Sequence, residues 1–209
     1  MRMDWVPVSA ALLLTGALAF CLGAFLMPRS DDAVDSLRIV QEQGGQWMTA
    51  AAILAIAAVC LSLGVPAILT LVQRRGWATG LLAAVVLEVG FIGTAAFALL
   101  MVFFHSLVVT GTVEAHGLDD VASETGLSVF FWIWIAGLYV GELLLAIALL
   151  RARTTPVWVP VVLLLHVFTL PLSTLLPEWP SKGTSLLLVL GFAGVAIHAA
   201  SPENRRRLG

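Results

Sequence analysis

The fold of this chain is decided by long apolar stretches, of which residues 127–150 are typical: they read LSVFFWIWIAGLYVGELLLAIALL. This stretch contains one charged residue, Glu142, and it is longer than the about 20 apolar residues that an α-helix needs to cross a bilayer. Lipid leaves every backbone N–H and C=O to be satisfied within the protein, and no strand-like alternation in short segments is present. The stretch therefore predicts a transmembrane helix.

The same composition extends over the whole chain. Its 209 residues are 60% hydrophobic and 11% charged, and its mean hydropathy is +1.00, whereas soluble domains have about 45–50% apolar residues. We predict an all-α polytopic membrane helix bundle, organised as a single integral-membrane domain over residues 1–209. Six expected transmembrane helices form three hairpins: Trp5–Met27, Trp47–Val72, Ala78–Phe104, Leu127–Leu150, Val157–Leu176 and Thr184–Ala200.

The connections between these spans predict their orientation. Arginine clusters follow the second, fourth and sixth spans, at residues 74–75, 151–153 and 205–207, while the opposite loops are acidic. Because lysine and arginine of short loops stay on the cytoplasmic side, we expect both termini in the cytoplasm and a multi-pass protein of the cell membrane. The arginines are thus topology signals, and with a net charge of -2 they indicate no nucleic-acid partner.

The outer loops predict a lid and no metal site. Ser30 can cap a short surface helix that Gly44 and Gly45 would stop, and such a helix could lie over the bundle. The third outer loop has four acceptable ligands for a cation: Glu114, His116, Asp119 and Asp120. They follow no recognised ligand spacing, so a solvated acidic loop is the preferred interpretation.

Cysteines and histidines predict no cofactor. Cys21 and Cys60 each lie within an apolar span, and they form no paired-cysteine motif or zinc spacing. Haem would need facing histidines at matching depth. His105 lies at an outer helix end, His166 lies deep and His198 lies near an inner end, so no such pair is expected.

Three ionisable side chains within the spans are the candidate catalytic residues: Glu88, Glu142 and His166. An ionisable residue in lipid is costly enough that function is the first interpretation, and counting about 1.5 Å per residue from the flanking arginines places all three at similar depth. Two carboxylates that face each other in a low dielectric cannot easily both ionise. One glutamate is therefore expected to hold and donate a proton, with His166 as its partner. The alternative is a hydrogen-bonded network that only joins three helices.

Aromatic residues of the fourth span are candidate substrate-binding residues. At 100° per residue, Phe131, Trp132 and Tyr139 fall within about 80° of Glu142, and such a wall would attract cations. A membrane-interface belt is the competing interpretation for Trp132.

Two further patterns concern helix faces. In the fifth span, Thr169 and Ser173 recur with His166 at i, i+3 and i+7, so they either line a substrate cavity or bond to backbone carbonyls of the bundle. Gly137 and Gly141 form a small-xxx-small pattern, which predicts close approach of another helix beside Glu142.

The chain's size, its buried carboxylates Glu88 and Glu142 and its aromatic content resemble those of small integral-membrane terpene cyclases, many of which have seven helices. The resemblance implies that one glutamate protonates a lipid-soluble isoprenoid, that Phe131, Trp132 and Tyr139 stabilise the cations, and that no metal is needed. The chain is also similar to six-span membrane proteins of high-GC bacteria, which implies a bacterial inner membrane.

Two other classes of function use the same residues differently. In a proton-coupled transporter the carboxylates would load and release protons while Thr169 and Ser173 line the path of a solute. A scaffold or accessory subunit would need no chemistry at the site. The expected partners are the lipid bilayer and a hydrophobic small molecule, and the sequence leaves the oligomeric state open.

Overall fold

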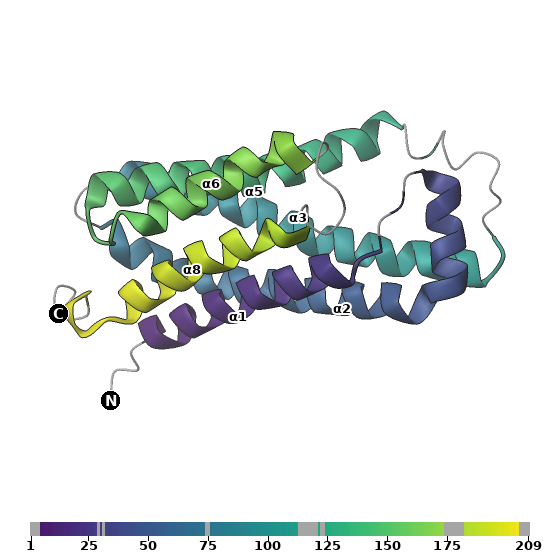
Figure 1. Cartoon of the computed structure of the whole chain (residues 1–209), viewed down its shortest axis with the longest axis horizontal. Coiled ribbons are helices and arrows are strands. Elements are labelled where there is room, and N and C mark those ends of the chain that lie inside the picture. The colour runs from purple at the N-terminus through teal and green to yellow at the C-terminus, as the bar shows by residue number, and fades with distance from the viewer. Residues whose placement is uncertain are drawn as a thin grey trace.

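The computed structural model describes residues 5–28, 30, 32–73, 76–112, 121, 124–173 and 182–204, with backbone alone for 33 and 170–173. Its main elements are helices that run along the long axis of the molecule (Figure 1). They are α1 (Trp5–Leu26), α2 (Ala33–Leu71), α3 (Trp77–Val109), α5 (Thr125–Ala152), α6 (Trp158–Ser173) and α8 (Ser185–Ala200). The all-α prediction is confirmed.

Four of these helices are long and apolar enough to cross a membrane. They are α1, α2, α3 and α5, with 22, 39, 33 and 28 residues. Helices α6 and α8 are also apolar, but each has 16 residues, fewer than the about 20 that a span needs. The first four predicted spans thus coincide with candidate membrane helices, and the six-span organisation stays a prediction.

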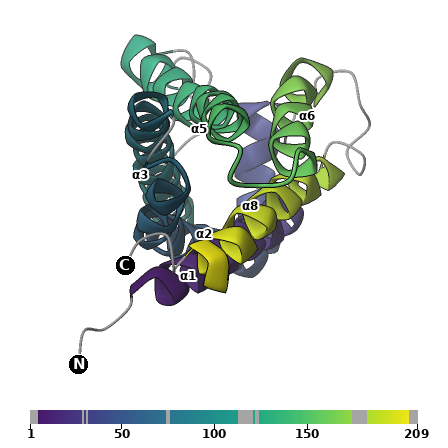
Figure 2. The same ribbon diagram turned by 90° about the vertical axis from the view of Figure 1, so that its left-hand side faces the viewer.

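The helices close into a ring because the last one returns to the first. Each helix packs on the next along the chain, and α8 packs back on α1, as the end-on view shows (Figure 2). The centre is filled by side chains: the rings of Phe91 on α3 and Phe192 on α8 are buried, with centroids 6.4 Å apart. Large apolar side chains such as Ile92 and Leu99 are exposed on the outside. A helix that is apolar on every side is suited to a lipid environment.

Glycines bring α3 and α5 into backbone contact, as the small-residue pattern predicts. A Cβ atom at Gly137 would lie 2.6 Å from the backbone nitrogen of Gly90, and one at Gly141 would lie 2.8 Å from that of Leu87. No side chain fits in so short a space. The two helices can therefore hold this separation only with glycine at these positions.

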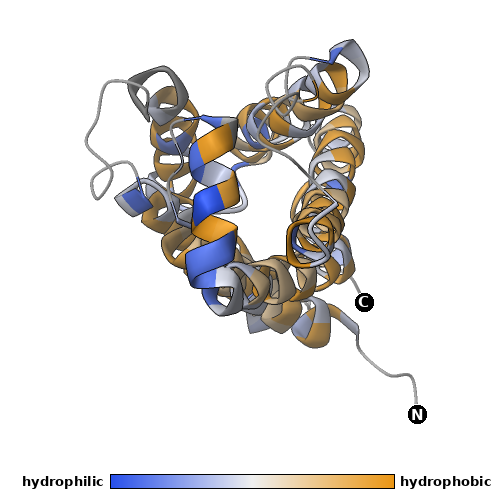
Figure 3. Ribbon diagram, turned by 90° about the vertical axis from the view of Figure 1, so that its right-hand side faces the viewer, coloured by the Kyte–Doolittle hydropathy of each residue, from blue (hydrophilic) through white to orange (hydrophobic). Residues whose placement is uncertain are grey.

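The first part of α2 forms an arm across one end of the bundle (Figure 1). Figure 3 shows that it carries both hydrophilic and hydrophobic residues, and its Ile39 and Val40 are buried with Met101 of α3. The predicted lid helix thus exists, but its cap is Asp32, which accepts a hydrogen bond from the backbone of Asp35, and the cap predicted at Ser30 is wrong.

The lid helix ends next to the glycine pair, close to the predicted stop. Gln43, directly before the pair, leaves helical geometry with a φ of -126° and a ψ of 32°, and a second helix continues the chain beyond this kink. Gly44 also allows a close approach, since a Cβ there would lie 2.8 Å from Nε2 of His105. Beyond the bend, Trp47 Nε1 donates to the carbonyl of Met101 over 2.9 Å, which anchors the continuing helix on α3.

Candidate functional site

The central contact of the site joins Glu142 on α5 to His166 on α6. Nδ1 of His166 lies 2.6 Å from Oε2 of Glu142. The two residues are 1% and 5% exposed, so water hardly reaches them. The two atoms are within hydrogen-bonding distance, and the tautomer of the imidazole decides which of them donates.

Tight packing on both sides of the pair sets the rotation of each helix. Gly141 rests against Leu87 of α3, and the next residue, turned by 100° around α5, is directed to α6. On α6, Leu163 occupies the space left by Gly191 of α8, and His166 lies almost one turn farther along. The glycine contacts thus help to orient both partners toward each other.

An aromatic ring completes this site. The ring of Tyr139 is stacked on the imidazole of His166, with centroids 5.4 Å apart and planes 13° from parallel. Tyr139 is half-buried and lies three residues before Glu142, so both side chains belong to the face of α5 that meets α6. The stacking fixes the plane of the imidazole and hence the direction of Nδ1.

Glu88 does not join the pair. Because Leu87 packs on Gly141, Glu88 and Glu142 lie at one level of the bundle, but Glu88 is turned 100° away from the α3–α5 contact. It is half-buried, and it forms no hydrogen bond or ion pair with any residue that the structure describes. The expected arrangement of two facing carboxylates is therefore corrected to one of a carboxylate facing an imidazole.

The expected aromatic wall is also not formed as a unit. Phe131 packs against Phe97 and Trp134, each with ring centroids 6.0 Å away. Trp132 is 70% exposed, as a residue of an interfacial belt would be. The reason is that α3 presents Phe97 to Phe131, so that Tyr139 alone of the three aromatic residues reaches the ionisable pair.

In the described part of α6, the polar stripe forms a hydrogen bond to the backbone of its own helix. Oγ1 of Thr169 donates to the carbonyl oxygen of His166 over 2.6 Å, which is the hydrogen-bonding alternative left open by the sequence. The side chain of Ser173 lies outside the described residues. So do four predicted loop ligands: Glu114, His116, Asp119 and Asp120. Within the described part of the chain, no group of three or more histidines, cysteines or acids could hold a metal ion.

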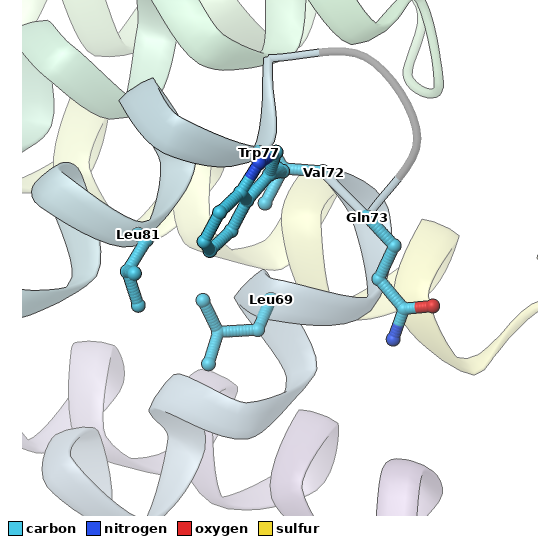
Figure 4. A pocket seen from close by; sticks show the side chains of 5 residues that line it. All are labelled: Leu69, Val72, Gln73, Trp77 and Leu81. Carbon is cyan, nitrogen blue, oxygen red and sulfur yellow. The ribbon is translucent and has the colours of Figure 1, made fainter.

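Sequence reasoning missed a pocket at the corner between α2 and α3. It has a volume of about 420 Å³ and is lined by Leu69, Val72, Gln73, Trp77 and Leu81 (Figure 4). The available signal was Trp77, an amphipathic aromatic residue at the first position of a membrane helix. The pocket contains none of the predicted site residues.

Comparison with models of protein families, with curated proteins and with solved structures gives no match for this chain.

Proposed function

We propose that this chain is a multi-pass membrane protein that carries a proton on the Glu142–His166 pair and couples its movement to the passage of a small molecule. The observation that carries the proposal is the 2.6 Å contact between the imidazole and the carboxyl group. Both side chains are buried within helices that are predicted to span the membrane. An ionisable pair at such a place is expensive to keep without a function.

The chemistry of the pair suits reversible proton transfer. An imidazole and a carboxylate in contact can share one proton, and histidine gains and loses a proton near neutral pH in ordinary surroundings. The pair also links two different helices, α5 and α6. A change in its protonation therefore changes the bond between these helices, and a transporter needs such a link between proton binding and helix position.

Protonation-initiated cyclisation of an isoprenoid is the second candidate. One observation favours it: the ring of Tyr139 lies beside the acid, where it could stabilise a cation. However, Phe131 packs in a separate aromatic cluster and Trp132 is exposed, so two of the three expected cation-stabilising rings are elsewhere. Transport has the stronger support for this reason.

Proton movement in liposomes tests the proposal. Purified protein is reconstituted with a pH-sensitive dye inside the vesicles, and ethidium, p-aminohippurate and glucose are offered in turn as a cationic, an anionic and a neutral solute. We expect one of these solutes to change the internal pH with wild type, and we expect Glu142→Gln and His166→Gln to abolish the change. Each substitution keeps a polar side chain but removes a group that can carry the proton.

Matched controls and a parallel assay separate the candidates. Glu42→Gln changes an exposed acid of the arm, and His198→Gln changes a histidine that bonds to the backbone of its own helix, so both should behave as wild type. Equal proton movement in all five proteins would contradict the proposal. Conversion of farnesyl- or geranylgeranyl-bearing compounds to products of equal mass, lost in Glu142→Gln, would support the cyclase instead.

A further inference from the structure

Glu88 is an ionisable group that the proposed proton site leaves unused. It lies in the first half of α3, is half-buried and has no hydrogen-bonding or ionic partner among the described residues. Acids inside membrane helices normally pair with a cation or face a polar cavity. Since no described residue pairs with Glu88, its carboxyl group is available to a positive charge that a ligand supplies.

Glu88 lies on the same face of α3 as the pocket. Leu81 lines the pocket and precedes Glu88 by seven residues, which in an α-helix means nearly the same direction and a distance along the axis of about 10 Å. The two side chains thus belong to one stripe. It starts at the pocket and ends at the carboxylate.

Helix α2 has a matching stripe. Leu69 lines the pocket, and Ser62, seven residues earlier and half-buried, lies two turns away on the same face. The helices run in opposite directions, with Val72 packed against Gly80, so Ser62 and Glu88 lie at a similar level. The seam between α2 and α3 therefore has an apolar end and a polar end.

The apolar end has the size and lining of a small-molecule site. Its volume of about 420 Å³ falls within the range of about 300–1,000 Å³ for such sites. In Figure 4 the side chains of Leu69, Trp77 and Leu81 converge on one space, and Gln73 lies at its edge. The indole of Trp77 offers a flat apolar surface that can also attract a cation.

We propose that the α2–α3 seam binds a lipid-soluble organic cation, with its apolar body in the pocket and its positive charge beside Glu88. The single acid Glu88 is complementary to one positive charge, and the apolar pocket is complementary to aromatic or alkyl groups. This assignment names the substrate class of the proposed transporter, and the role of the site in transport rests on that proposed function. Binding itself does not depend on proton transfer and can be measured separately.

Equilibrium binding in lipid nanodiscs tests the site. The probe is decyltrimethylammonium, whose charge lies at one end of an apolar chain, and 2,2-dimethyldodecane is its neutral counterpart of the same shape. We expect saturable binding of the cation by wild type and at least a tenfold loss of affinity in Glu88→Gln, because the amide keeps the shape of the side chain without its charge. Binding of the neutral probe should be the same in both proteins.

Further variants make each outcome decisive. Leu81→Trp fills the pocket and should lower the binding affinity of both probes, whereas Glu42→Gln should lower neither affinity. Absence of saturable binding by wild type, or equal affinity in wild type and Glu88→Gln, would overturn the proposal. Glu142→Gln should still bind the cation, so cation binding without any proton movement in liposomes would refute the proposed function and leave the site intact.

Discussion

Breaking the Glu142–His166 contact should destabilise the bundle in a way that reveals how the pair is bonded. The informative set is Glu142→Leu, His166→Leu and the double variant. Each single change leaves an ionisable side chain buried without its partner, since the two residues are only 1% and 5% exposed. The double change replaces both groups by apolar ones of comparable size.

The expected magnitudes follow from this burial. Removing one partner of a buried ion pair costs about 3–5 kcal/mol in soluble proteins, whereas hydrogen bonds between membrane helices average about 0.6 and reach about 1.7 kcal/mol. The 2.6 Å separation and the two ionisable partners place this pair at the upper end of the membrane range or above it. We expect each single variant to lose about 2 kcal/mol.

The double variant should be nearly as stable as wild type, within about 1 kcal/mol. An apolar contact between the two leucines leaves no buried ionisable group without a partner, so the stability lost in each single variant is regained. The assay is unfolding in mixed micelles as sodium dodecyl sulfate is added, followed by circular dichroism. A double variant that loses the sum of the two single losses would refute the reasoning. It would mean that the side chains contribute packing and no mutual bond.

Three other predictions concern packing, capping and a buried hydrogen bond, and each is measured by the same unfolding assay. Gly137→Ala should cost about 1–3 kcal/mol of stability, since its Cβ would lie 2.6 Å from the backbone of α3. The control Gly45→Ala, whose Cβ would meet nothing within 4 Å, should be neutral or stabilising. Equal losses of stability in the two variants would contradict the packing argument. Backbone N–H groups at the start of α5 hold the pKa of Glu124 below its usual range. The stabilisation by this cap is therefore complete above the unfolded-state pKa and is lost as the pH falls through the lower folded-state pKa. The difference in unfolding free energy between wild type and Glu124→Gln should shrink on acidification, and a constant difference would exclude the cap. Trp47→Phe should cost about 1 kcal/mol through its lost buried hydrogen bond, and an unchanged stability would show that this bond does not anchor the second part of α2 on α3.

Much of the helical architecture could be read from the sequence because hydrophobic length is a local property. The predicted span Leu127–Leu150 lies within α5, which the structure extends by two residues at each end. The arm was predicted less well. Its end was predicted at Gly44 and Gly45, next to the observed kink at Gln43, but its cap was predicted at Ser30 and is Asp32. Its packing on α3, such as the approach of His105 to Gly44, is contained in no local pattern.

The candidate site shows the same division. Depth along a helix follows from counting residues, so the sequence could place Glu88 and Glu142 at one level, as the contact of Leu87 with Gly141 shows. Rotation about the helix axis depends on which neighbours pack on each face. That rotation turned Glu142 to His166 and left Glu88 on another face of the bundle.

The sequence by itself determined an all-α, strongly apolar chain and the identity of its few ionisable residues within the helices. Tertiary structure alone decided which of them meet. Hydrophobicity acts on each segment separately, through transfer from water to an apolar phase. A hydrogen bond requires two helices at a set distance and rotation, and here glycine contacts of α5 with α3 and of α6 with α8 help to set the rotation of the helices that carry Glu142 and His166.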